Sequence, residues 1–443
     1  METPIYDFLR SYADSETLRA HMPGHKGVSP IGELAELYNL DITEIKGADS
    51  LFEADGIIAR SEANASQLYG TAATVYSAGG STLCIQAMLA LMKQEKRRII
   101  AVRNVHRAFL NAAALLGLDV QWLLPEYSEG ILSGRIILPD VEAALAASAE
   151  RACVYVTSPD YTGRIADIAA LSALCHQYGA KLLVDNAHGA HLAFFEESLH
   201  PIALGADLCC DSAHKMLPAL TGAAMLHTSC NEYAHKLKQA MSLFGSTSPS
   251  YLVMASLDLC NRYIYEKIRC DIAAALPRIA KLRESFSDSL IFTKSEQFHI
   301  TIKAAESGYS GTELAELLRD NDVECEYADE ELLVLLMSPF SLGEDYVRLQ
   351  AALEIAVSKA SRYERRTSDF RLNLPKVACS IREAVFAPSE EIAVEGSEGR
   401  VCASVKVPCP PAIPIAVSGE VIDRQCMEIF RAYGIKSVIV LKN

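Results

Sequence analysis

Lys215 is the residue whose position most suggests covalent chemistry. It directly follows a predicted buried strand within DSAHKMLPALTGAA, residues 211–224. A lysine at the carboxyl end of a strand can be partly desolvated, and desolvation favours the neutral amine that forms an imine with an aldehyde. An isolated lysine at such a place is more often one whose ammonium group simply reaches solvent. Whether Lys215 forms an imine or only reaches solvent therefore has to be inferred from the neighbouring residues.

Asp185 lies thirty residues earlier, in VDNAHGAH, at the end of another β-rich run. A carboxylate there can keep a heterocyclic nitrogen protonated, as the partner of the pyridine nitrogen of pyridoxal phosphate (PLP) does. The alternative is an aspartate that caps a helix or closes a turn.

A glycine turn followed at once by a long apolar helix is predicted at SAGGSTLCIQAMLALM, residues 77–92. Gly80 permits close backbone approach, Ser81 and Thr82 supply hydroxyl groups, and the helix start offers N–H groups and the positive end of a dipole. These are the parts of a phosphate site, although Ser/Thr capping explains the same pattern. The chain contains neither G-x-G-x-x-G nor G-x-x-x-x-G-K-[ST], so dinucleotide and Walker-type sites lose support.

His106 follows the predicted strand RIIAV, where an imidazole can stack on a flat ring or simply begin a helix. His106, Asp185 and Lys215 each lie near the end of a predicted strand, and Gly80 lies in the same region of alternating strands and helices. Strands without polar alternation, separated by helices such as 165–179, predict an α/β fold with a mainly parallel sheet covered on both faces. Ligands of such sheets bind beyond the carboxyl ends of the strands. The strands are expected at 98–102, 153–158, 181–187, 208–213 and 222–228.

The pattern along the chain predicts four parts. Residues 1–50 are expected to be an N-terminal arm or loop, 51–260 a large α/β domain, 261–365 a small α+β domain and 366–443 a C-terminal module. The charged stretch 361–373 is expected to connect the last two parts.

Composition narrows the class of protein. The 443 residues carry 41 Lys and Arg against 56 Asp and Glu, a formal charge of -15. Nucleic-acid binding needs clustered basic residues, so no nucleic-acid partner is expected. Thirteen scattered cysteines without C-x-x-C spacing indicate reduced core residues and no metal site. Without a leader-like N-terminus or an apolar run of about 18 residues, a cytoplasmic protein with no membrane partner is expected.

The sequence resembles the Orn/Lys/Arg decarboxylases, PLP-dependent enzymes of the aspartate-aminotransferase-like fold type I. The resemblance covers nearly the whole chain, and the S-x-H-K-x-L-x-x-L-T-G stretch and the Pro-rich C-terminal segment are its most specific parts. The motifs that carry it are HMPGHKG (21–27), DITEIKGADSLFEADG (41–56), GGST (79–82), RNVHRA (103–108), TSPDYTGRIADI (157–168), DNAHGAH (185–191), SAHKMLPALTGAA (212–224), STSPSY (246–251) and PCPPAIPIAVSGEVI (408–422).

The resemblance implies a role for each candidate residue. Lys215 would carry PLP through an imine, Asp185 would pair with the pyridine nitrogen, and His106 would stack on the ring. Lys215 or His214 would return a proton to the substrate's Cα. The remaining residues expected to contact the cofactor are Gly80, Ser81, Thr82, Ala187, His188, Ser212, His214, Ser246 and Thr247.

The implied reaction is decarboxylation of a basic amino acid (arginine, lysine or ornithine) to CO2 and an amine of polyamine biosynthesis. The turn at 246–248 would reach a cofactor across a subunit interface, so at least a homodimer is implied. Glu420 is expected to bind the distal cation of the substrate, with an exposed C-terminal carboxylate as the alternative.

Two residues depart from the family's pattern: Asn186 stands where D-E-A-H-G has its glutamate, and Gly79 where an asparagine is usual. The N-terminal receiver-like domain of longer members is also expected to be absent. An aminotransferase or lyase on the same fold remains an alternative, with Arg164 or Arg348 available to hold a substrate carboxylate. The second alternative to a decarboxylase is a non-catalytic relative that acts as a binding subunit.

Overall fold

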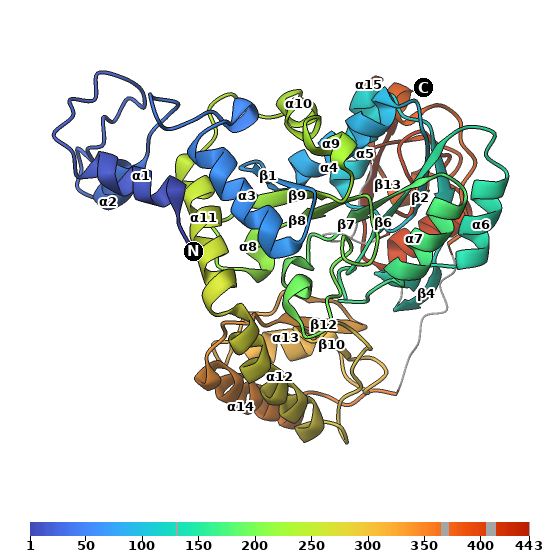
Figure 1. Ribbon diagram of the computed structural model, residues 1–443. Helices are drawn as coiled ribbons and strands as arrows, with labels where there is room; N and C mark the ends of the chain where they lie inside the picture. The colour runs from blue at the N-terminus through green and yellow to red at the C-terminus, as the bar shows by residue number, and fades with distance from the viewer. Residues whose placement is uncertain (130–131, 365–371, 405–412, 443) are drawn as a thin grey trace. The chain divides into compact units, whose positions relative to one another are not determined.

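The computed structural model describes residues 1–129, 132–364, 372–404 and 413–442 (Figure 1). The chain forms two compact units. Unit 1 contains Met1–Lys96, Ile168–Gln177 and Lys181–Arg269, and unit 2 contains Arg97–Asp167, Tyr178–Ala180 and Cys270–Asn443. The four-part division expected from the sequence is finer than these units and stays a prediction. Part of the predicted 361–373 connection and of the Pro-rich segment lies outside the described residues.

Four strands of unit 1 lie in the order β1-β9-β8-β7. Strands β7 and β8 are parallel, whereas β9 runs antiparallel to both β8 and β1. Their residues are buried almost throughout, as expected for strands covered on both faces. The strand bounds are β1 (Ala73–Ser77), β7 (Lys181–Asp185), β8 (Leu208–Asp211) and β9 (Ala224–Thr228).

Helix α4 (Gly80–Gln94) packs on β1, β8 and β9, and most of its residues are buried. Helix α7 (Ile168–Gln177) packs on β7, and Gly179 follows it with a φ of +65°, a left-handed conformation that glycine adopts without steric cost. The sequence predicted this helix and its glycine stop. The other helices of unit 1 are α3 (Ile57–Tyr69), α8 (Ala213–Met216), α9 (Asn231–Ala234), α10 (Leu237–Ser242), α11 (Tyr251–Glu266) and the 3-10 turns η1 (Leu51–Glu53) and η2 (Ala190–Phe194).

The N-terminal segment differs from the predicted arm or loop because it contains two helices, α1 (Pro4–Ala13) and α2 (Ala35–Leu40). Helix α1 has Pro4 in its first turn and packs on α3 and α11 through buried Ile5 and Leu9. The carboxylate of Asp258 on α11 accepts hydrogen bonds from the backbone N–H groups of Ile5 and Tyr6, at 2.9 and 3.0 Å. The sequence signal for a helix start, a proline just inside it, was present.

Unit 2 contains a parallel set of strands in the order β6-β2-β3. It also contains an antiparallel sheet β10-β12-β11, an antiparallel sheet β13-β15-β14 and the hairpin β4-β5. The bounds are β2 (Arg98–Val102), β3 (Val120–Leu123), β4 (Glu126–Glu129), β5 (Ser133–Arg135), β6 (Ala152–Thr157), β10 (His299–Lys303), β11 (Tyr327–Ala328), β12 (Leu332–Leu336), β13 (Ser389–Ala393), β14 (Cys402–Ser404) and β15 (Ser437–Leu441).

The C-terminal part of unit 2 has an apolar core of its own, formed by residues between Leu372 and Val440. Helix α15 begins with a capping box between Ser380 and Glu383, which satisfies N–H groups at the helix start. The helices of unit 2 are α5 (Arg107–Leu116), α6 (Leu138–Ala146), most of α12 (Ile268–Ser285), α13 (Gly311–Arg319), α14 (Gly343–Lys359), α15 (Ile381–Phe386), α16 (Arg424–Ala432) and the 3-10 turn η3 (Val394–Gly396).

The α/β class predicted from the sequence is confirmed, with parallel pairing between β7 and β8 and within β6-β2-β3. The cysteines of the described residues are free thiols, and most are buried, as the sequence predicted. Within the same residues, none of the helices has the length and apolar character needed to cross a membrane.

Candidate active site

Lys215 lies on α8, the short helix that begins directly after β8. Ser212 precedes this helix, and its carbonyl accepts a hydrogen bond from the Lys215 backbone N–H at 3.1 Å. The Lys215 Nζ lies 2.9 Å from the Nε2 of buried His188. An unprotonated imidazole nitrogen at this distance can accept a hydrogen bond from the Lys215 side chain. The side chain of Lys215 is exposed in this chain, which differs from the partial burial expected from the sequence.

Asp185 is the last residue of β7 and is 2% exposed. Its Oδ1 accepts from the Ala187 backbone N–H at 3.2 Å and lies 3.6 Å from the Cys210 Sγ on the neighbouring strand. The contact with Ala187 is a turn contact of the kind that the alternative interpretation expected. It leaves the carboxylate at the carboxyl end of β7, where the predicted role also places it.

The start of α4 is tied to the segment that carries Lys215. The Gly80 N–H donates to the Gly222 carbonyl oxygen at 2.8 Å. Ser81 is half-buried and Thr82 is exposed. N–H groups in the first turn of a helix have no partner within the helix, and the dipole of this 15-residue helix favours an anion there. This end of α4 therefore suits a phosphate group.

His214 points back toward its own segment. Its Nδ1 lies 3.0 Å from the carbonyl oxygen of Ala223, and the side chain is half-buried. A neutral ring that donates from Nδ1 to this carbonyl keeps Nε2 as the nitrogen able to exchange a proton. If His214 returns a proton to the substrate's Cα, as predicted, it would do so from Nε2.

His106 belongs to unit 2, where it precedes α5. Its Nδ1 accepts from the Ala108 N–H at 3.1 Å, so it caps the helix, as the structural alternative expected. The proposed stacking on a cofactor ring stays a prediction.

Ser246 and Thr247 are exposed in unit 1, and the Ser246 hydroxyl accepts from the Ser248 N–H at 3.1 Å. That is the contact of an ordinary turn. Their reach across a subunit interface stays a prediction.

Glu420 is buried, so the alternative of an exposed carboxylate is wrong. Its two oxygens accept from the guanidinium nitrogens of Arg103 at 2.7 and 2.6 Å, and Oε2 also accepts from the Val417 N–H at 2.7 Å. Arg103 is fully buried and donates as well to the carbonyl oxygens of Pro414 and Ile415. These contacts give Glu420 a structural partner within unit 2 and do not support the predicted contact with a substrate.

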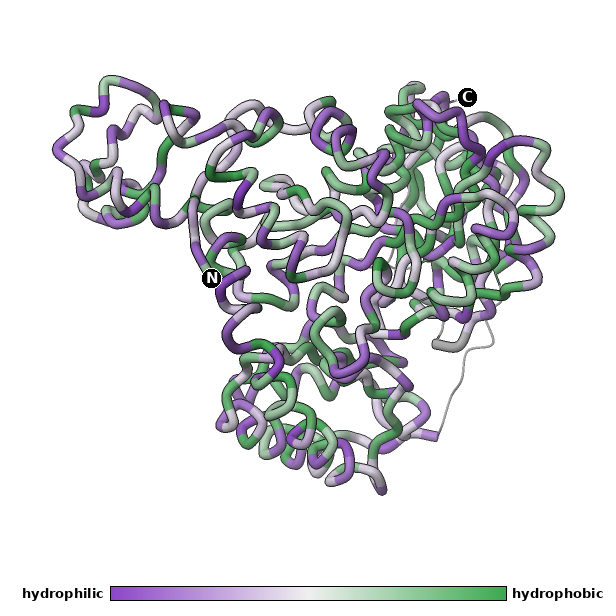
Figure 2. The backbone as a smooth tube through the Cα atoms, in the orientation of Figure 1, coloured by the Kyte–Doolittle hydropathy of each residue, from purple (hydrophilic) through white to green (hydrophobic). Residues whose placement is uncertain are grey.

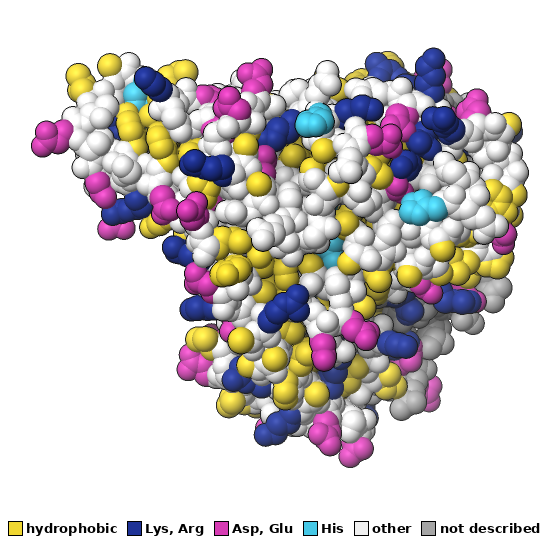
Figure 3. All heavy atoms as spheres, in the orientation of Figure 1, with side chains coloured by type: hydrophobic (Ala, Val, Ile, Leu, Met, Phe, Trp, Pro, Cys, Tyr) yellow, Lys and Arg dark blue, Asp and Glu magenta, His cyan; other side chains and the backbone are white. Residues whose placement is uncertain are grey.

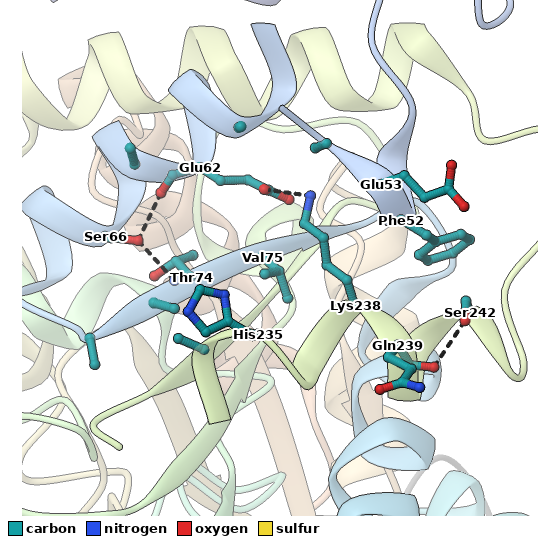
Figure 4. A pocket seen from close by; sticks show the side chains of 16 residues that line it. Phe52, Glu53, Glu62, Ser66, Thr74, Val75, His235, Lys238, Gln239 and Ser242 are labelled. Carbon is teal, nitrogen blue, oxygen red and sulfur yellow. Dashed lines mark hydrogen bonds and ion pairs between the residues drawn. The ribbon is translucent and has the colours of Figure 1, made fainter. Parts of the chain in front are cut away.

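Unit 1 also holds a cavity of about 670 Å³ lined by residues of α3, β1 and α10. Figure 4 shows Glu62 and Lys238 pointing toward each other in it, with the Lys238 Nζ 2.7 Å from Glu62 Oε2. Burial raises the pKa of Glu62 to about 7, although Lys238 opposes this shift. None of the predicted site residues lines this cavity.

Three residues near the site escaped the sequence analysis: His200, Asp211 and His227. Asp211 is the last residue of β8, immediately before Ser212, and the two histidines contact it. The period-2 alternation of β8 places Cys209 and Asp211 on one face, but nothing in the sequence links either histidine to that face.

The residues of unit 1 fit PLP. The cofactor needs an amine for its aldehyde, an anion for its ring nitrogen and N–H donors for its phosphate. Lys215, Asp185 and the start of α4 supply these groups, and hydrogen bonds between Gly80 and Gly222 and between the Asn186 N–H and the Cys210 carbonyl join the three segments.

Comparison with known proteins identifies the family of the chain. The family model "Orn/Lys/Arg decarboxylase, major domain" matches residues 3–305, which include Lys215 and Asp185 but not Glu420. The uncharacterized Bacillus subtilis protein YaaO is 28% identical over 97% of this chain and 93% of its own length. The Bacillus subtilis arginine decarboxylase is 27% identical over 96% of this chain and 92% of its own length.

A solved structure shares the fold. The Francisella novicida lysine decarboxylase LdcF superposes with a TM-score of 0.81 at 17% sequence identity, over 99% of this chain and 81% of that protein. The fold that the resemblance implied is thereby confirmed.

Proposed function

Because the chain belongs to the Orn/Lys/Arg decarboxylase family, whose members are PLP-dependent amino acid decarboxylases, we propose that it converts a basic amino acid to the corresponding amine and CO2. The observation that carries the proposal is the Lys215–His188 pair at the end of β8, one strand away from the buried carboxylate of Asp185. The pair places an amine able to act as a nucleophile beside a side chain that orients it by a hydrogen bond.

When bound, PLP supplies the electron sink for the bond between Cα and the carboxylate. The residues of this chain have separate tasks around it. Asp185 would hold the proton on the ring nitrogen, and the start of α4 would hold the phosphate. His188 would orient the Lys215 amine through its hydrogen bond. Lys215, or His214 through Nε2, would then deliver a proton to Cα.

Arginine is the first substrate to test, since a relative that covers nearly the whole chain is named an arginine decarboxylase. Lysine and ornithine carry the same kind of distal cation and are the other candidates. A formal charge of -15 helps to attract a cationic substrate but does not select one. The product would be an amine of the kind used in polyamine biosynthesis.

A homodimer is part of the proposal. Large apolar side chains are exposed along the segment between α1 and α2 and in α2 itself, where Leu18 is 87% and Ile31 80% exposed. Figure 3 shows hydrophobic side chains on the surface of this segment, and Figure 2 shows that hydrophobic and hydrophilic residues alternate along it. A second copy that covers this surface would remove it from water. The reach of the turn at 246–248 to a neighbouring site is the other part of this proposal.

The test begins with purified protein, PLP and borohydride. Peptide mapping should locate the reduced pyridoxyl group on Lys215, and arginine, lysine and ornithine should be screened for release of CO2 and amine. Lys215→Ala should lose both the adduct and turnover, whereas Lys359→Ala, at the exposed end of α14, should behave as wild type. A keto acid product would favour an aminotransferase, and absence of any adduct would favour a binding subunit.

A further inference from the structure

The carboxylate of Asp211 is fully buried at the end of β8, between the segments that carry Asp185 and Lys215. The Asn186 Nδ2 donates to its Oδ1 at 2.7 Å, and the Cys209 Sγ lies 3.5 Å from the same oxygen. On the other oxygen, Oδ2, the Nε2 of His200 makes a hydrogen bond of 3.1 Å, and the Nε2 of His227 lies 3.2 Å away in poorer alignment. Four polar groups thus surround one buried anion.

These neighbours favour the ionised form of Asp211. Burial alone would raise its pKa, but the contacts with His200 and His227 hold the pKa of Asp211 well below its usual range. Burial lowers the pKa of His227 and so favours its neutral form, in which Nδ1 can accept from the Thr74 hydroxyl at 2.8 Å. Its Nε2–H then faces Asp211. The carboxylate is therefore held by donor groups in place of water.

The contact with Asn186 joins two strand ends. Asn186 directly follows Asp185, and its backbone N–H donates to the Cys210 carbonyl oxygen at 3.0 Å. Asp211 directly precedes Ser212, where the turn to Lys215 begins. The amide of Asn186 has little freedom, because a Cβ at Gly189 would lie 1.9 Å from its Oδ1. The side-chain bond to Asp211 therefore adds to the backbone bond and fixes the Asn186 side chain against the end of β8.

We infer that Asp211 is a positioning residue that fixes the turn after Asp185 against the turn that carries Lys215. The inference rests on the proposed function, since these two turns would hold opposite ends of the PLP ring. Asn186 stands where the family's motif has an acid, and in this chain the acid of the contacting pair is Asp211 on the adjacent strand.

The same donors could in principle ligate a metal ion, since His200, Cys209 and Asp211 offer atoms within 4.8 Å of one another. Hydrogen bonds to a carboxylate account for the observed separations and for the low pKa of Asp211. A metal ion bound at these three residues would contradict the inference.

The test compares Asp211→Asn, Asn186→Ala and the exchanged pair Asn186→Asp/Asp211→Asn. PLP affinity, the visible band of the PLP–lysine adduct with its pH midpoint, and the melting temperature are measured for each. Asp211→Asn should weaken PLP binding by about tenfold or more, since a charge-assisted hydrogen bond is lost, and should shift the pH midpoint. Asn186→Ala should act in the same direction, and it decides the question if Asp211→Asn does not fold. The exchanged pair should recover part of the lost affinity.

Asp258→Asn is the matched control, since Asp258 is another fully buried carboxylate of unit 1 and holds α1 by hydrogen bonds. It should lower the melting temperature and leave the PLP band and its pH midpoint unchanged. If the Asp211 and Asn186 variants bind PLP with a Kd within twofold of the wild-type value, the inference is wrong and the proposed function still stands. A stoichiometric metal in the wild type that Asp211→Asn loses would also contradict the inference. A wild-type protein that binds no PLP would overturn the proposed function, and the inference with it.

Discussion

Glu420→Gln is the substitution that best separates a structural role from a substrate role. The change keeps the shape of the side chain but removes the negative charge that both terminal nitrogens of Arg103 contact. Arg103 is fully buried and would keep the carbonyl oxygens of Pro414 and Ile415 and the amide oxygen of the new glutamine as acceptors, but it would have no negative charge beside it. Breaking one side of a buried ion pair typically costs about 3 to 5 kcal/mol, because the remaining charge is left uncompensated.

The single tryptophan of the chain reports on this pair directly. The Arg103 guanidinium carbon lies 5.3 Å from the centre of the Trp122 ring, so fluorescence during urea unfolding follows the environment of the pair. We expect the unfolding free energy of Glu420→Gln to fall by about 3 kcal/mol or more. In the folded enzyme the KM for the basic substrate should stay near that of wild type.

Two further variants act as controls. Glu428→Gln removes an exposed partner of Arg424 in the same module and should change stability by less than about 0.5 kcal/mol. The double change Arg103→Met/Glu420→Leu removes both charges and should cost less than Glu420→Gln alone. A Glu420→Gln protein of wild-type stability with a strongly raised KM would refute this reasoning and restore the predicted substrate contact.

Three other predictions concern single residues. Asp185→Asn should still bind PLP but lose orders of magnitude in turnover, since an amide does not stabilise a protonated ring nitrogen as an anion does; full activity would remove that argument. His106→Ala should lower turnover only mildly, and a complete loss would show that its role is larger than ring packing. Because the pKa of Glu62 is raised from 4.5 to about 7, its burial destabilises the fold as pH rises from 4.5 to 7. Glu62→Gln should remove a stability loss of up to about 3 kcal/mol over that interval, which urea titrations of both proteins at pH 4.5 and 7 will reveal or exclude.

The main elements of the fold were open to prediction because their signals are local. The β-rich runs predicted at 98–102 and 181–187 became β2 and β7 (Lys181–Asp185), and α7 ends at Gln177, just before the predicted glycine stop at 179. The antiparallel direction of β9 was not predicted, because an apolar run looks the same in either direction. Helix α1 was not predicted, although Pro4 marked its start, because the Gly, Pro and His residues that follow in the first 50 residues favour a loop.

The sequence alone predicted which residues carry the chemistry: Asp185 at the end of β7, Lys215 after β8 and a glycine turn before α4. Their neighbours in the chain and the ends of the strands identified them. Only the tertiary structure decided what surrounds them. Glu420 meets Arg103 across 317 positions and Asn186 meets Asp211 across 25. Such partners depend on how whole elements pack, and periodicity along the chain carries no information about them, because it reports only which face of an element avoids water.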